Sequence, residues 1–395
     1  MTYIKNYFKE LRVLLKENIR DYGMFIALGI IMIIFAITSG GLFLGSRNIS
    51  NLLNQTGYIG VLSVGMTLVI IIRHIDLSVG YVSGFIGALS AILIVQYNLP
   101  ALIAIFLVTI VGIFIGLWHG FLVAYMKLPA FVATLAGMFI FRGAIQQTLR
   151  GTGTIIIDND LYRAISNGYI PDIASYPNLH VLTLILGIVG VLIYIIFEIR
   201  NHRIKKSYDF EVLTKPMLIS KIAFIGGLVM LLSVSMATHR GMPWTMVIVF
   251  TVVLIYHIMM NNTILGRNIY AVGGNPEAAE LSGISVKKIT LFVFASMGFL
   301  SALSGIMFAS RLQSATVTAG RLFELEAIAG AFVGGVSATG GIGKVTGSLI
   351  GAFVMASLTS GMNLMGVGSA VQFIVKGAVL VIAVIFDVRT RKEGK

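Results

Sequence analysis

Long apolar runs alternate with short polar stretches along almost the whole chain. Most of the runs are long enough for a helix rising 1.5 Å per residue to cross the roughly 30 Å hydrocarbon core of a bilayer. The pattern predicts an all-α fold, a polytopic membrane helical bundle of about 12 transmembrane spans (about 10–12, because Gly-rich segments can re-enter the membrane without crossing it). The expected spans begin near Met24 and Leu52 and continue as Gly80–Val95, Ala101–Met126, Ala130–Leu149, His180–Phe197, Met217–Ala237, Trp244–Met260, Ile289–Ala309, Leu325–Thr339, Val345–Met365 and Ser369–Phe386.

Composition agrees with a membrane location, since 57% of the 395 residues are hydrophobic and 11% are charged. A soluble fold does not hide that much apolar surface. The chain contains no cysteine, which excludes disulfides, thiolate nucleophiles and Cys–metal sites. The first residues do not resemble a cleavable signal peptide.

The distribution of lysine and arginine predicts the orientation, because cytoplasmic loops carry an excess of both. Basic residues gather in segments 1–21, 200–221, 267–288 and 389–395, whereas the long loop 150–179 carries three aspartates. With an even number of spans, both termini are expected in the cytoplasm of a multi-pass plasma-membrane protein. Segment 1–21 is expected as a cytoplasmic amphipathic helix, 22–388 as one transmembrane domain with cytoplasmic loops at 199–216 and 261–288, and 389–395 as a cytoplasmic tail.

Two Gly-rich segments carry a small residue at every fourth position: Gly80 and Gly84 in one, and Gly343, Gly347 and Gly351 in the other. This spacing places small residues on one helix face, where a second helix can pack closely. Each segment follows a polar break, which suggests a weak internal repeat. Membrane bundles commonly use such faces for packing, and the pattern alone leaves both interpretations open.

Polar residues inside or beside apolar runs are the candidates for a translocation path. Arg73 and Asp76 are three residues apart and can pair on a helix face, and Asp76 leads directly into a small-residue face, which suggests a polar hinge. Asn51, Asn54 and Gln55 share a face at the start of the second span. Amide side chains suit a neutral hydroxylated solute, and they equally suit interhelical hydrogen bonds. His119 and His257 are expected to be packed side chains, not ligands.

No residues point to an enzyme or to a bound cofactor. The segment Gly340–Ser348 superficially resembles a phosphate-binding loop, but position 338 is alanine and Val345 follows the lysine, so the nucleotide motif is absent. No His or carboxylate cluster has the spacing of metal ligands. Neither a catalytic site nor a metal site is therefore expected.

The polar stretch Gly266–Gly283 interrupts two long apolar blocks and predicts a short surface helix. Asn275 suits the N-cap, Pro276 the first turn, and Glu277 the positive end of the helix dipole. Ala278 and Ala279 are small helix formers, and Gly283 suits a left-handed helix end. The stretch is either a plain connector or a contact element for a partner.

Three motifs resemble the permeases of monosaccharide ABC importers, the ribose/galactose/xylose group. IDLSVG at 75–80 resembles that family's GGIDLSVG, LPAFVATLAGMFIFRG at 128–143 resembles IPPFIATLG…RG, and 266–284 resembles GR…IYAIGGN…EAA…LSGI. The motifs span most of the chain in family order. Arg73 and His74 replace the usual glycines, and Ala130 and Ala136 depart from Pro and Gly. The extra block Arg150–Pro243 makes the chain most similar to the xylose or multiple-monosaccharide branch.

The resemblance implies a permease subunit that imports a monosaccharide. Two copies would form the pore, a separate cytoplasmic ATPase subunit would bind ATP-Mg, and an extracytoplasmic sugar-binding protein would deliver the solute. Asn275, Pro276, Glu277, Ala278, Ala279 and Gly283 would form the helix that couples to the ATPase. The alternatives are an ion-coupled secondary sugar transporter and, with less support, an intramembrane enzyme. Nucleic acid is not an expected partner.

Overall fold

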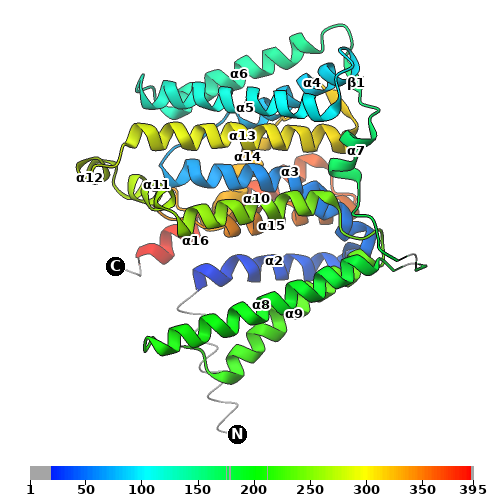
Figure 1. The fold of residues 1–395 in the computed structure, drawn as a ribbon, viewed down its shortest axis with the longest axis vertical. Helices are drawn as coiled ribbons and strands as arrows, with labels where there is room; N and C mark the ends of the chain where they lie inside the picture. The colour runs from blue at the N-terminus through cyan, green and yellow to red at the C-terminus, as the bar shows by residue number, and fades with distance from the viewer. Residues whose placement is uncertain (1–18, 175, 178, 211, 393–395) are drawn as a thin grey trace.

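The computed structural model describes residues 19–174, 176–177, 179–210 and 212–392, and in them the chain is a bundle of mostly parallel and antiparallel helices (Figure 1). Most of the predicted N-terminal amphipathic segment lies outside these residues. α12 and the end of α16 lie at one edge of the bundle, and α7 and β1 at the opposite edge. The helices are α2 (Ile19–Thr38), η1 (Leu42–Leu44), α3 (Ser46–Ile71), α4 (Val79–Val95), α5 (Ala101–Ala124), α6 (Ala130–Thr148), α7 (Asp160–Asn167), α8 (Val181–Ser207), α9 (Lys215–Ala237), α10 (Trp244–Asn262), α11 (Ile264–Gly274), α12 (Pro276–Leu281), α13 (Val286–Leu312), α14 (Phe323–Val333), α15 (Val345–Leu364) and α16 (Ser369–Lys392).

The predicted helical membrane bundle is confirmed, and each expected span contains a helix. Within the described residues, 7 helices are long and apolar enough to cross a membrane, and three shorter apolar helices accompany them. The span expected at Leu325–Thr339 is wrong in its bounds, since α14 has only 11 residues, about 17 Å of helix. α8 continues to Ser207, so the first half of the predicted cytoplasmic loop 199–216 is helical.

α3 and α13 occupy the centre of the bundle, where α13 runs between α3 and α5 (Figure 1). In its most apolar stretch, 89% of α3 is buried. Glycines let α13 and α5 approach closely: a Cβ added at Gly116 would lie 3.0 Å from the Cα of Gly298. Close packing of this kind holds helices together in lipid, where apolar burial alone gives no driving force.

The two small-residue faces pack against the same part of the chain. A Cβ at Gly84 would lie 2.8 Å from the carbonyl carbon of Ala319, just before α14. A Cβ at Gly351 would lie 2.6 Å from the backbone nitrogen of Gly334, just after it. The short helix α14 is therefore held between α4 and α15, and its ends are protected by protein instead of lipid.

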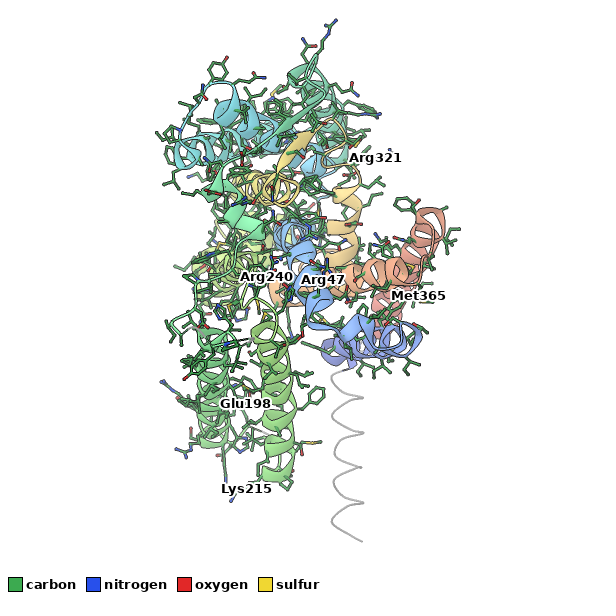
Figure 2. The ribbon with its side chains drawn as sticks, turned by 90° about the vertical axis from the view of Figure 1, so that its right-hand side faces the viewer. Arg47, Glu198, Lys215, Arg240, Arg321 and Met365 are labelled. Atoms are coloured by element: carbon green, nitrogen blue, oxygen red, sulfur yellow. The ribbon has the colours of Figure 1, made fainter. Side chains whose placement is uncertain are left out.

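α8 and α9 form a hairpin that packs mainly on itself and stands apart from the remaining helices (Figure 2). Only 11% of the apolar stretch of α8 and 22% of that of α9 are buried. Lys221 Nζ lies 2.6 Å from Glu198 Oε1 and links the two helices. The hairpin lies within Arg150–Pro243, the block expected from the sequence to be extra relative to ribose-type permeases.

A short antiparallel ladder closes the edge of the bundle that carries α7. β1 (Thr154–Ile156) pairs with β2 (Ser314–Thr316), with Ile155 opposite Ala315. The Ser310 hydroxyl donates to the carbonyl of Tyr162 at 2.6 Å, and the Tyr162 and Ser90 hydroxyls are 2.6 Å apart. These bonds connect α7 to α13 and α4.

Candidate functional site

The stretch that the sequence singles out forms α11 and α12, at the edge of the bundle opposite α7 (Figure 1). Asn275 is the N-cap of α12, and its side chain accepts a hydrogen bond from the Ala278 nitrogen at 3.1 Å. Pro276 opens the first turn and Glu277 contributes the acidic side chain there. The sequence therefore folds here through an ordinary capping arrangement.

The end of α12 shows which of its residues remain available to a partner. Gly283 has φ 82° and donates its N–H to the carbonyl of Glu280 at 2.9 Å, which closes the helix in the left-handed region. Ala279 is buried, whereas Glu277 and Ala278 are exposed and Leu281 is 91% exposed. A charged and partly apolar tip projects from the bundle.

The break between α3 and α4 differs from its prediction. Residues 72–78 are not helical, so Arg73 and Asp76 do not share a helix face and no ion pair joins them in the described structure. Asp76 is 3% exposed, and its Oδ1 accepts hydrogen bonds from the Ser78 nitrogen at 2.8 Å and the Ser78 hydroxyl at 2.6 Å. Arg73 points instead to the end of α11.

A polar basin of about 770 Å³ lies near the edge of the bundle that carries α7. Two predicted path residues, Asn51 and Asn54, line it, and Gln55 and Asp76 do not. Asn54 is 5% exposed, and its side-chain oxygen accepts no hydrogen bond within the described structure. The full lining is Arg47, Asn51, Asn54, Asn167, Tyr169, His239, Arg240, Arg311, Leu312 and Gln313.

The basin is positively charged, because its lining includes three arginines and no carboxylate. Figure 2 shows Arg47 and Arg240 close together above the hairpin. Burial lowers the pKa of His239, and the neighbouring cations Arg240 and Arg47 lower it further. The sequence analysis missed these arginines, which come from three separate elements. The only feature of the sequence around each arginine that could have indicated the basin is that it lies beside the end of a span.

Aromatic rings lie one helical turn beyond the basin on both of its main helices. Tyr58 follows Asn54 by four positions on α3, and Phe308 precedes Leu312 by four on α13. The centroids of the Tyr58 and Phe308 rings are 5.1 Å apart, and Phe323 packs against both, at 5.1 and 4.8 Å. A cluster of three rings thus lies one helical turn away from the lining of the basin.

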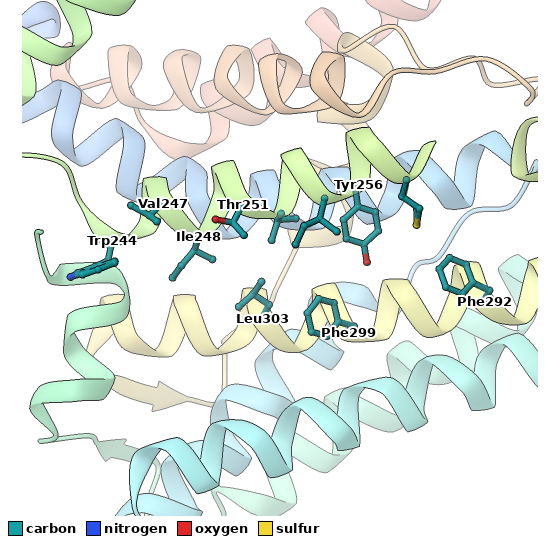
Figure 3. A pocket seen from close by; sticks show the side chains of 11 residues that line it. Trp244, Val247, Ile248, Thr251, Tyr256, Phe292, Phe299 and Leu303 are labelled. Carbon is teal, nitrogen blue, oxygen red and sulfur yellow. The ribbon is translucent and has the colours of Figure 1, made fainter. Parts of the chain in front are cut away.

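A second cavity, of about 610 Å³, lies between α10 and α13 and has a different character (Figure 3). Its lining is almost wholly apolar and includes Trp244, Phe292, Phe299 and Leu303. Such a surface suits lipid or another apolar face and offers few partners to a hydroxylated solute. The basin is therefore the better candidate for contact with a polar solute.

The two lone histidines differ from each other. His119 is 1% exposed and packs beside Trp118, with ring centroids 4.8 Å apart, as the sequence predicts. The expectation for His257 is wrong, because that side chain is exposed on α10 and lies 3.0 Å from the Asn261 amide. Among the described residues, no three His, Cys, Asp or Glu side chains are grouped to hold a metal ion.

Comparison with known proteins gives whole-length matches. The xylose transport system permease protein XylH of Haemophilus influenzae is 36% identical over 376 residues, covering 95% of this chain and 98% of that protein. XylH of Escherichia coli (strain K12) is 37% identical over 378 residues, covering 95% and 94%. The ribose import permease protein RbsC of Haemophilus influenzae is 37% identical over 366 residues, covering 92% and 91%.

No solved structure matches the chain. Residues 48–384 match the family described as "Branched-chain amino acid transport system / permease component". This region runs from the first turn of α3 into α16. It includes the break at 72–78, the α11–α12 loop and every basin residue except Arg47. The match covers most of the chain and the relatives agree with it in kind, so this protein belongs to that family of transport-system permease components.

Proposed function

We propose that this chain is the permease subunit of an ATP-driven importer that moves a monosaccharide, of the xylose or ribose kind, into the cytoplasm. The observation that carries the proposal is the whole-length similarity to permeases named for xylose and for ribose. The family description mentions amino acids, but the relatives that match over more than nine-tenths of their length are named for sugars. The neutral amide side chains of the basin also suit a hydroxylated solute.

The proposed partners follow from the similarity of this chain to transport-system permeases. A separate cytoplasmic ATPase subunit binds ATP-Mg and contacts α12, and an extracytoplasmic sugar-binding protein delivers the solute to the edge that carries the basin. A second copy of the chain completes the pore. The exposed tip of α12 supports the ATPase contact, because a short capped helix moves as a rigid unit.

The proposed path begins in the basin, where Asn51 and Asn54 exchange hydrogen bonds with the hydroxyl groups of the sugar. The unpartnered oxygen of Asn54 supports this role, since a buried acceptor without a donor is costly unless a ligand or water satisfies it. Gln55 and Asp76 are assigned to later parts of the path. Asp76 would act there through the break between α3 and α4.

The test of the proposal is uptake of labelled D-xylose and D-ribose into proteoliposomes that contain the permease, its ATPase subunit and the sugar-binding protein. We expect uptake that requires ATP and the binding protein and that survives collapse of ion gradients. Glu277→Lys reverses a charge on the exposed face of α12, and Gly283→Val places a β-branched residue at φ 82°. Both variants are expected to remain folded in the membrane, to lose ATPase association and to abolish uptake.

Asp160→Lys is the matched control, because Asp160 is also an exposed first-turn acid, on α7 at the opposite edge. It is expected to bind the ATPase as the wild type does. Wild-type uptake by Glu277→Lys at equal expression would defeat the coupling assignment. Uptake driven by an ion gradient alone would favour the secondary transporter.

The proposed orientation places both termini and α12 in the cytoplasm and the basin outside. The chain has no cysteine of its own, so single cysteines introduced at Asp160 and Lys206 report one site each. In intact cells, an impermeant maleimide should label position 160 and leave position 206 unlabelled until the membrane is opened. Labelling of both from the same side would contradict the orientation.

A further inference from the structure

Arg73 holds the end of the helix that leads into α12. Its Nε donates a hydrogen bond to the Gly273 carbonyl at 2.7 Å, and its Nη2 donates to the Gly274 carbonyl. These carbonyls belong to the last residues of α11, and Asn275, the N-cap of α12, follows directly. A guanidinium that binds two successive carbonyls restrains both their position and their direction, which a single point charge does not.

The backbone around this clamp leaves little room for adjustment. The Ile71 carbonyl accepts a hydrogen bond from the Gly341 nitrogen at 2.8 Å, and a Cβ added at Gly273 would collide with that same carbonyl. The Tyr270 hydroxyl donates to the Gly343 carbonyl at 2.7 Å. The end of α3, the end of α11 and the segment before α15 therefore meet as one tightly packed junction.

Arg73 occupies a backbone conformation that favours another residue. Its φ is 65°, in the left-handed region that glycine adopts freely and that most other residues avoid. This conformation closes α3 in a left-handed turn, in which the Arg73 nitrogen donates to the Ile70 carbonyl at 2.9 Å and the His74 nitrogen donates to the Val69 carbonyl at 3.0 Å. Backbone strain that the surrounding structure holds in place is typical of residues that orient other groups.

From Arg73 the chain enters the bundle without an intervening helix. The Ile75 carbonyl accepts a hydrogen bond from the Thr134 hydroxyl at 3.3 Å. Asp76 binds Ser78 at the start of α4. Two residues later, Gly80 contacts Gly320 and the buried Glu324, at the start of α14. One short segment thus joins the base of α12 to the contact between α4 and α14.

We propose that Arg73 is a positioning residue that ties α12 to the break between α3 and α4, so that a displacement of α12 is passed to the start of α4. The proposal rests on the proposed function, because it assigns the source of that displacement to the ATPase subunit. Residues 72–78 act as the connecting element, and the two carbonyl contacts of Arg73 are its attachment point.

The clamp can be tested on the permease alone, without any transport assay. A spin label on Leu281→Cys, at the 91% exposed end of α12, reports the mobility of that helix in detergent. Arg73→Gly removes both hydrogen bonds and relaxes the backbone at φ 65°, so the variant is expected to fold and to give a clearly more mobile label. Arg73→Lys keeps the charge and is expected to be intermediate. Arg267→Ala, which removes an exposed arginine of α11, should leave the label unchanged.

Coupling is measured in the reconstituted transporter as sugar-stimulated over basal ATP hydrolysis. Loss of one hydrogen bond to a charged group changes an equilibrium about tenfold or more. Because Arg73→Gly loses two, it is expected to lower uptake by at least about tenfold and to bring the ratio close to one, with ATPase association retained. A wild type without ATP-dependent uptake would overturn the proposed function. If the wild type transports sugar and Arg73→Gly matches it in both label mobility and coupling, the role of Arg73 is overturned and the proposed function stands.

Discussion

The central helix α3 and the peripheral helix α8 show opposite relations between apolar composition and burial. α8 has the higher mean hydropathy, yet 11% of its apolar stretch is buried, against 89% for α3. α3 carries Ser, Thr, Asn and Gly among its buried residues, whereas the large exposed side chains in the apolar stretch of α8 are those of Ile, Leu, Val and Phe. In this bundle, a higher hydropathy of a helix therefore does not mean deeper burial.

The physical reason is that lipid tails are as apolar as leucine, so an apolar side chain gains nothing by leaving lipid for protein. Helices associate where their backbones approach closely and where polar groups find partners. The Thr67 hydroxyl, for example, contacts that of Ser348 across α3 and α15. Small residues are thus expected to matter in the bundle and to be replaceable on the outer face of the hairpin.

The largest effect is expected for Gly84→Leu and Gly347→Leu. A side chain at either position collides with backbone, of Ala319 in the first case and of Gly334 in the second. Backbone atoms cannot rotate away as a flexible side chain does. We therefore expect the free energy of unfolding to fall by about 3 kcal/mol or more. The measurement is the yield of monodisperse protein and its thermal unfolding in detergent. A normal melting curve for both variants would mean that these faces point to lipid.

A smaller, local effect is expected for Gly187→Leu. Its Cβ would lie 2.5 Å from the Cβ of Ser233, so the variant separates α8 from α9 and leaves the bundle intact. We expect increased proteolysis in the hairpin, with the melting temperature of the bundle nearly unchanged.

The controls are Gly190→Leu and Gly227→Leu, whose added Cβ atoms meet nothing within 4 Å. Replacing an exposed helical glycine should be neutral or stabilise the helix by about 0.5–1 kcal/mol. If Gly190→Leu damages the protein as severely as Gly347→Leu, the outer face of α8 is packed against protein and the contrast with α3 fails.

The sequence predicted the features whose causes are local. The length of the apolar runs predicted the helices, and small residues at every fourth position predicted the packing faces. Asn275 and Gly283 predicted the two ends of α12. The apolar run 325–339 predicts a full span where the structure has the short helix α14. The helix nevertheless stops before Gly334. The residues that flank it can be non-helical because α4 and α15 enclose them.

The features that the sequence did not predict depend on contacts between distant residues. Arg73 reads as the local partner of Asp76, but its hydrogen bonds go to Gly273 and Gly274, about 200 residues away. The arginines of the basin come from α3, α13 and the loop after α9. Each reads alone as a charge at the end of a span, and only the fold brings them together.

The self-contained packing of the α8–α9 hairpin also bears on how this lineage can change. A unit whose helices contact mainly each other can be inserted into a gene, shortened or removed while the junctions of the bundle keep their geometry. Its lipid-facing residues are under selection chiefly for hydrophobicity, so many substitutions among Ile, Leu, Val and Phe are neutral there. Divergence between descendants of this chain is accordingly expected to accumulate first in the hairpin and last at Gly84, Gly347 and Gly351.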